Sequence, residues 1–131
     1  KLVRIASIFF YRHIAKNLRA VFIFRNPADV KASLFRRGIS KFKPDWVENN
    51  NALIAAYENI DKSIIISYES LVSGDENTKN KFQSLGFDIN MDIIDKAHQT
   101  QNKSKVMITE DEKKMYNLLK ELEAEQATSL K

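Results

Sequence analysis

The sequence predicts an α/β fold in which helices flank an incomplete parallel sheet, within a single domain over residues 1–131. Two apolar runs, Ala20–Phe24 and residues 63–68, are typical of buried strands. Helical patterns lie between and after them, and this spacing suits the long crossover that joins parallel strands. Because two strands are too few for an independent parallel sheet, we expect a missing N-terminal part to carry the others.

Composition limits the class of protein. The chain has 131 residues, of which 44% are apolar, with three glycines, two prolines and no cysteine. These values exclude collagen-like, low-complexity and disordered chains, and they remove disulfides and thiolate sites. No apolar run approaches the length of a membrane-spanning helix. Since the chain begins at Lys1 without a methionine or a signal-like segment, we expect a fragment of a longer product, with a cytoplasmic location as the default.

Charge is distributed unevenly along the chain. Eleven basic residues and one acidic residue lie between Lys1 and Lys43, so this segment carries a net charge of +10, whereas the remaining residues carry −6. Such an excess suits an anionic ligand such as a nucleotide phosphate, a nucleic-acid backbone or an acidic glycan. A solvated helix face would have the same composition.

The first expected elements are a helix over residues 3–17 and a strand over Ala20–Phe24. Apolar residues recur along the helix at three- and four-residue steps. They are Ile5, Ile8, Phe9, Ile14 and Leu18. The strand is a continuous β-branched and aromatic run, so we expect both of its faces to be covered.

The residues after this strand predict the start of a helix. Asn26 is a good N-cap, and Pro27 suits the first helical position, where its missing N–H costs nothing. Asp29 adds negative charge to the first turn. The helix therefore begins at Pro27, and Gly38 is placed to end it.

A further helix and strand follow. The helix opens after Asp45 and runs over Trp46–Asn59, with Leu53 and Tyr57 on its apolar face. The strand covers residues 63–68, and residues 69–72 lead from it into a polar connection.

The last third of the chain is expected to be mainly helical. Helices are predicted over residues 77–85 and 92–98, and a polar loop over residues 99–106. A capping box of Thr109 and Glu112 opens the C-terminal helix. Its apolar face consists of Met115, Leu118, Leu119 and Leu122. Its many glutamates are interpreted as a solvated face.

A cationic cluster follows the first strand. In open α/β sheets ligands bind beyond the carboxyl ends of the strands, and Arg25 ends this strand. Its guanidinium is always charged and its fork suits a phosphate. Ser33 lies about 10 Å along the next helix, and Arg36 and Arg37 share its side of that helix. These residues could form an anion pocket with one neutral donor, or a solvated helix with two solubilising arginines.

The segment RNPADVKAS over residues 25–33 resembles the R-[ND]-P-x-D-x-x-x-S motif of the sulfotransferase family. The order of the later elements is also similar to that family. A helix with a tryptophan is followed by a strand ending in YESL, against Y-E-D-L in the family, and then by a helix closing on Leu-Gly. The resemblance covers residues 19–86. It implies a P-loop-like parallel sheet flanked by helices, of which this chain would be the C-terminal portion.

The resemblance also implies an activity. Sulfotransferases transfer a sulfuryl group from phosphoadenosine phosphosulfate to an acceptor hydroxyl or amine on a small molecule or glycan, without a metal. Arg25 and Ser33 would contact the ribose phosphate of this donor. Tyr68 is either a contact to the adenine or a core residue, and Thr100 corresponds to a hydroxyl near the adenine in some members. Glu69 would be structural.

Part of the family's pattern is missing. Glycines occur only at positions 38, 74 and 86, so the chain holds no P-loop-like G-x-x-x-x-G-K segment. Lys1 lies at a suitable distance ahead of Arg25 to be the lysine that acts on the acceptor or on the sulfuryl group. His13 is interpreted as a surface or packing residue. Sulfotransferase activity is therefore expected only if a missing N-terminal segment completes the domain.

Two other functions stay open. One is a non-catalytic module that binds nucleic acid or an acidic glycan through the basic segment, and the other is a truncated relative that binds nothing. A shortage of exposed aromatic side chains speaks against nucleic acid, because Phe9, Phe22 and Phe24 are expected to be buried. No metal site is expected, since cysteine is absent and His13 and His98 are far apart in sequence.

Overall fold

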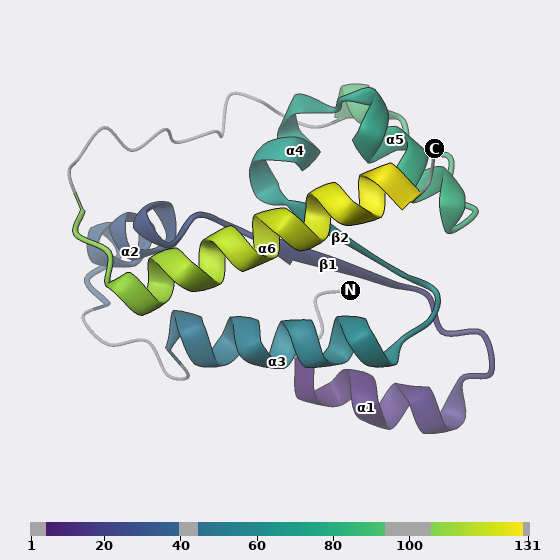
Figure 1. Cartoon of the computed structure of the whole chain (residues 1–131), viewed down its shortest axis with the longest axis horizontal. Coiled ribbons are helices and arrows are strands. Elements are labelled where there is room, and N and C mark those ends of the chain that lie inside the picture. Colours follow the sequence, from purple (N-terminus) through teal and green to yellow (C-terminus); the bar gives the residue numbers. More distant parts are fainter. Residues whose placement is uncertain (1–4, 40–44, 94–105, 130–131) are drawn as a thin grey trace.

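A small parallel sheet lies among helices in the computed structural model of this chain, which describes residues 5–39, 45–93 and 106–129 (Figure 1). The elements are α1 (Ile5–Ile14), β1 (Ala20–Phe24), α2 (Pro27–Arg36), α3 (Trp46–Asn59), β2 (Ser63–Ser67), α4 (Tyr68–Ser73), α5 (Glu76–Ser84), the short 3₁₀ helix η1 (Met91–Ile93) and α6 (Glu110–Ser129). The predicted α/β class is therefore confirmed, with more helix than strand.

The sheet has two strands over the described residues, β1 and β2, and they are parallel. Ala20 pairs with Ser63 and Phe24 with Ser67, so the strands are in register along their whole length. The crossover between them passes through α2 and α3. Because the strands run in the same direction, the residues after Phe24 and after Ser67 emerge at the same end of the sheet, where both strands have their carboxyl ends.

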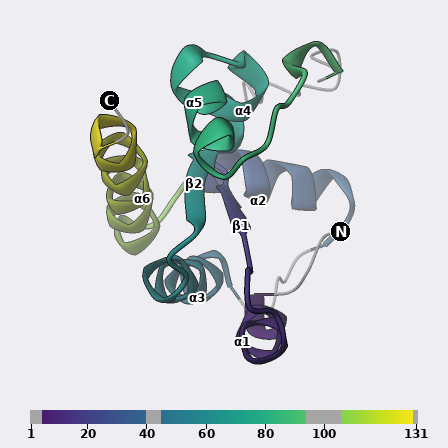
Figure 2. The same cartoon turned by 90° about the vertical axis from the view of Figure 1, so that its right-hand side faces the viewer.

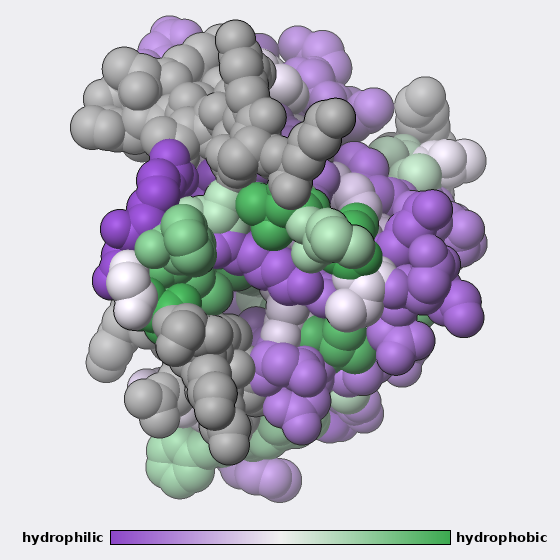
Figure 3. Space-filling view, turned by 90° about the vertical axis from the view of Figure 1, so that its left-hand side faces the viewer, coloured by the Kyte–Doolittle hydropathy of each residue, from purple (hydrophilic) through white to green (hydrophobic). Residues whose placement is uncertain are grey.

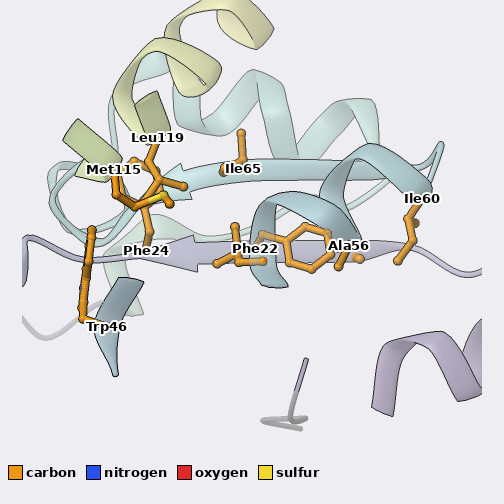
Figure 4. Close-up of a cluster of buried hydrophobic side chains, with 10 residues drawn as sticks. Phe22, Phe24, Trp46, Ala56, Ile60, Ile65, Met115 and Leu119 are labelled. Carbon is orange, nitrogen blue, oxygen red and sulfur yellow. The ribbon is translucent and has the colours of Figure 1, made fainter. Parts of the chain in front are cut away.

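The two faces of the sheet bury different clusters. Phe22, Phe24 and Ile65 point to one face, where α3 and α6 cover them with Trp46, Leu53, Met115 and Leu119 (Figures 2 and 4). Ile64 and Ile66 point to the other face and pack on Phe82 and Leu85 at the end of α5. The two strands therefore form the centre of a layered core.

Burial differs from the prediction at residues of β1 and α1. Ile23 is 47% exposed, so the expectation that β1 is covered on both faces is wrong at this residue. The reason is that the cluster with α5 packs on β2 and on Val21 but leaves Ile23 outside it. Phe9, expected to be buried, is 39% exposed on α1, because only part of that helix packs against α3.

Helix boundaries follow the local signals in most cases. The predicted starts at Pro27 and Trp46 are confirmed, and Gly38 adopts a positive φ of 69° after α2. The helix expected over residues 3–17 ends earlier, at Ile14, because the chain turns before β1. The helix expected over residues 77–85 lies one residue earlier, since Asp75 accepts a hydrogen bond from the Thr78 N–H at 2.8 Å and so caps it.

One helix was not predicted. The strand expected over residues 63–68 ends at Ser67, and the residues that lead to the polar connection at Gly74 and Asp75 form the helix α4, which begins at Tyr68 directly after β2. The Ser67 side chain accepts a hydrogen bond from the Ser70 N–H and therefore acts as an N-cap while it still belongs to the strand. Of the helix expected over residues 92–98, residues 94–98 lie outside the described residues, as does most of the expected loop over residues 99–106.

Side chains close the outer edge of β2. Gln126 of α6 accepts a hydrogen bond from the Ile65 N–H at 3.0 Å and donates one to the Ser63 carbonyl at 2.9 Å. Glu123 accepts a hydrogen bond from the Ser67 N–H at 2.8 Å. The Lys81 ammonium donates to the carbonyls of Ile65 and Glu123, both at 2.8 Å. We refer to Lys81, Glu123 and Gln126 as the β2 edge network.

This network changes the interpretation of the C-terminal helix. Its glutamates were expected to form a solvated face, but Glu112 and Glu123 are buried. Burial alone would raise the pKa of Glu123, yet hydrogen bonds from Ser67 and from the Lys120 ammonium outweigh it and lower the pKa below its ordinary value. An ionised glutamate thus takes the place that a neighbouring strand would occupy beside β2. The described residues form no such side-chain network along the outer edge of β1.

Lys81 predicts an unusual dependence of stability on pH. Burial lowers the pKa of Lys81 from 10.5 to about 8. Between these values the unfolded chain binds more protons than the folded protein, so the free energy of unfolding should rise with pH. Burial raises the pKa of Tyr116 to about 12, which reverses the trend above pH 10. We expect a gain of about 2 to 3 kcal/mol between pH 8 and pH 10.

Urea unfolding at a series of pH values tests this expectation. In Lys81→Met the rise between pH 8 and pH 10 should disappear. Lys79→Met is the matched control, because Lys79 lies in the same helix and its side chain is 43% exposed. A rise that persists unchanged in Lys81→Met would contradict the assignment.

Candidate anion-binding site

Arg25 and Tyr68 meet at the carboxyl ends of the two strands. Arg25 follows the last residue of β1, and Tyr68 follows the last residue of β2. The guanidinium carbon of Arg25 lies 4.7 Å from the centroid of the Tyr68 ring. This distance is that of a cation–π contact, which is worth about 0.5 to 2 kcal/mol. The parallel register of the strands therefore brings together two of the predicted site residues.

The Arg25 guanidinium keeps a donor without a protein partner. Its Nε is buried and has no hydrogen-bond partner among the described residues. Buried donors are paired in most proteins, and an unpaired one costs about 1 to 3 kcal/mol. A cation at the end of a parallel strand with a buried unpaired donor is a feature that a bound anion would satisfy.

The turn after Arg25 is fixed by its own residues. The Asn26 side chain accepts a hydrogen bond from the Ala28 N–H at 2.9 Å, and Pro27 is buried at the first position of α2. The Asn26 carbonyl accepts the first helical hydrogen bond, from Val30. The R-N-P sequence thus places Arg25 at the junction of strand and helix with little freedom of the backbone.

The other predicted cations and the hydroxyl belong to α2. Ser33 is half-buried and forms no hydrogen bond with another described residue, whereas Arg36 and Arg37 are exposed at the end of the helix. Arg25 and Ser33 are both described, and they form no hydrogen bond with each other. A ligand that joins them would have to span the distance along the helix.

A second set of polar groups lies beside the site. Both carboxylate oxygens of Glu69 are buried and have no hydrogen-bond partner among the described residues. Burial, together with the negative charges of Glu69, Glu123 and Asp29, raises the pKa of Tyr116 to about 12. The Tyr116 phenol therefore stays protonated at neutral pH, and its ring packs edge-on against Phe24 at 6.1 Å between centroids.

Three predicted residues cannot be placed. Lys1, Thr100 and His98 lie outside the described residues. His13 is exposed in the last turn of α1, as its interpretation as a surface residue requires. No sulfuryl-transferring group is therefore assigned in the described part of the chain.

Comparisons with models of protein families, with curated proteins and with solved structures gave no match. The site is thus defined by its own geometry. Residues 5–39, 45–93 and 106–129 contain no group of three or more histidine and acidic side chains that could hold a metal ion. In the same ranges no helix is long and apolar enough to cross a membrane.

Sequence reasoning missed the environment of Glu69. A carboxylate two residues after an apolar strand gives no sign that its oxygens are buried without partners, because such burial is set by segments that are distant in the sequence. One of these segments is α6, where burial and the charge of Glu69 raise the pKa of Tyr116. Arg25 and Tyr68, in contrast, could be found from their positions at strand ends.

Proposed function

We propose that this chain forms the ribose-phosphate side of a phosphoadenosine phosphosulfate site, in a sulfotransferase whose sheet has the P-loop-like arrangement. The observation that carries this proposal is the Arg25 guanidinium at the carboxyl end of β1, stacked 4.7 Å from the Tyr68 ring centroid with a buried unpaired Nε. The R-N-P motif and the order of the elements that follow it also support this proposal.

Each residue has a distinct role in this proposal. Arg25 presents its fork to two oxygens of the ribose phosphate, since a guanidinium can donate two parallel hydrogen bonds. Ser33 adds a neutral donor from α2. One face of the Tyr68 ring holds Arg25, and the opposite face contacts the adenine. Thr100 would add a hydroxyl near the same base.

The reaction itself is an in-line displacement. The bond between sulfur and the donor's phosphate oxygen breaks while the acceptor oxygen or nitrogen bonds to sulfur, and the acceptor proton passes to a base. Charge spreads over the transferring oxygens, so the reaction needs positioned cations. The described residues bind and orient the donor, and Lys1 is the candidate for the cation at the sulfuryl group.

Calorimetric titration with adenosine 3′,5′-bisphosphate tests the proposal. The desulfated donor product should bind, and adenosine 5′-monophosphate, which lacks the ribose phosphate, should bind at least tenfold more weakly, as expected for loss of a charge-assisted contact. Circular dichroism of the same sample establishes that the protein is folded.

Two results would contradict the proposal. Equal affinity for both nucleotides would remove the ribose phosphate from the site. Tight binding of an oligonucleotide with a steep salt dependence, together with no preference for the bisphosphate, would favour the nucleic-acid module instead.

A further inference from the structure

A cavity of about 690 Å³ lies between α2, the start of α3 and the start of α6. Its walls include Val30, Leu34, Phe35, Trp46 and Val47. The end of the molecule formed by α2 and the first turns of α6 shows hydrophobic side chains beside hydrophilic ones (Figure 3). Small-molecule sites have volumes of about 300 to 1,000 Å³ and apolar walls with a few polar groups, so both size and lining suit a ligand.

A buried carboxylate in this cavity has an unused oxygen. Glu112 is only 6% exposed. Its Oε1 accepts hydrogen bonds from the Lys31 ammonium at 2.6 Å and from the Thr109 N–H at 3.3 Å. Its Oε2 is buried without a hydrogen-bond partner among the described residues. A buried oxygen of this kind calls for a donor from a ligand.

The charge of the cavity favours a cation. Burial alone would raise the pKa of Glu112, but its hydrogen bonds with Lys31 and Thr109 outweigh burial and lower the pKa, so the carboxylate is ionised at neutral pH. Among the described residues that line the cavity, Asp45 and Asp111 are also acidic, and Lys31 is the one basic residue and is already paired with Glu112. The described lining thus holds three acidic residues and one lysine whose ammonium has a partner.

We propose that this cavity binds a small primary ammonium compound with an aromatic or aliphatic body. The ammonium donates a hydrogen bond to Oε2 of Glu112, and the body packs against Phe35 and Trp46. The site is independent of the proposed donor site. Residues two positions apart on a helix point to nearly opposite sides, so Lys31 and Ser33 serve different faces of α2.

The fluorescence of Trp46 offers a direct measurement, because it is the chain's one tryptophan and lines the cavity. The probes are 3-phenylpropylammonium, 3-phenylpropan-1-ol and 3-phenylpropanoate at pH 7. These share one apolar body and differ in charge. The ammonium should bind at least tenfold more tightly than the alcohol, and the carboxylate should bind more weakly than the alcohol.

Variants separate the carboxylate from the apolar wall. Glu112→Gln keeps a side-chain acceptor for the Thr109 N–H and should lower the ammonium affinity to that of the alcohol. Phe35→Ser should lower the affinity for each probe that binds the unaltered protein. It should leave folding intact because Phe35 is 83% exposed. Phe10→Ser is the matched control, since Phe10 is 64% exposed on α1 and should leave every affinity unchanged.

Three outcomes would overturn the inference. They are absence of a fluorescence change with the ammonium, equal affinity for ammonium and alcohol, and unchanged ammonium affinity in Phe35→Ser. Thermal melts of each variant show whether the fold is retained. Binding of the alcohol and the ammonium with equal affinity would show an apolar groove without a role for Glu112.

Discussion

Arg25→Ala is expected to weaken binding of adenosine 3′,5′-bisphosphate by about 2 to 5 kcal/mol, which is about thirtyfold or more. The physical reason is the loss of the cation at the end of β1, whose buried Nε is unpaired among the described residues. Arg25→Lys should give an intermediate loss, because it keeps the charge but not the fork. Isothermal titration calorimetry measures each affinity.

Arg12→Ala is the matched control for this measurement. Arg12 is an exposed arginine of α1, which lies away from α2 in both cartoon views (Figures 1 and 2). It lowers the net charge by the same amount and should leave the affinity nearly unchanged. If both variants lose affinity equally, overall charge rather than a built site binds the nucleotide. An unchanged affinity in Arg25→Ala would refute the site assignment.

Glu123→Ala should lower the free energy of unfolding by about 3 to 5 kcal/mol. The carboxylate accepts hydrogen bonds from the Ser67 N–H at 2.8 Å and the Ser67 hydroxyl at 3.1 Å, and it pairs with the Lys120 ammonium at 3.0 Å. Without it, the Ser67 N–H stays buried without a partner at the outer edge of β2. Urea unfolding followed by circular dichroism measures the loss.

Glu121→Ala provides the control on the same helix. Glu121 is exposed, so its removal should change stability by less than about 0.5 kcal/mol. The loss in Glu123→Ala should also shrink at acid pH. Since the pKa of Glu123 in the folded protein is below its ordinary value of 4.5, the stabilisation is present above that value and is lost as pH falls through the folded pKa. A stability loss equal to that of Glu121→Ala would show that the β2 edge network is dispensable.

Local signals in the sequence account for much of this fold. N-caps and apolar periodicity predicted the helices that begin at Pro27 and Trp46, and the capping box at Thr109 is present in both directions. These features depend on neighbouring residues, so a single sequence contains them. The extent of the sheet and the exposure of Ile23 depend on contacts between distant segments, which no local pattern specifies.

The C-terminal helix illustrates the limit. The predicted apolar face included Leu118, yet Leu118 is 43% exposed, and the buried positions are Glu112, Met115, Leu119 and Glu123. These positions are three and four residues apart, so the predicted period is confirmed. Met115 and Leu119 are buried as predicted and Leu122 packs partly buried against the core, whereas Leu118 lies outside the buried stripe. Two glutamates belong to the buried stripe because their partners, Lys31 and Ser67, come from other elements.

Lys81 is another charged residue within a buried helical stripe. It shares one side of α5 with Thr78 and Phe82, at helical spacing, and all three are buried. A lysine within such a stripe is a signal that its ammonium has internal partners, because buried lysines are rare without them. For the anion site, the strand-end positions of Arg25 and Tyr68 were predictable, whereas the burial of both Glu69 carboxylate oxygens required the structure.

The side-chain closure of β2 also has a consequence for amide hydrogen exchange. The N–H groups of Ile65 and Ser67 bond to Gln126 and Glu123 of α6, not to a neighbouring strand. Their exchange therefore requires α6 to detach, while the two strands can remain paired. Slow deuteration of these two amides would report the free energy of helix detachment separately from global unfolding. The same two hydrogen bonds occupy N–H groups that an incoming strand would need, so over the described residues β1, and not β2, carries the edge at which intermolecular β-structure could start.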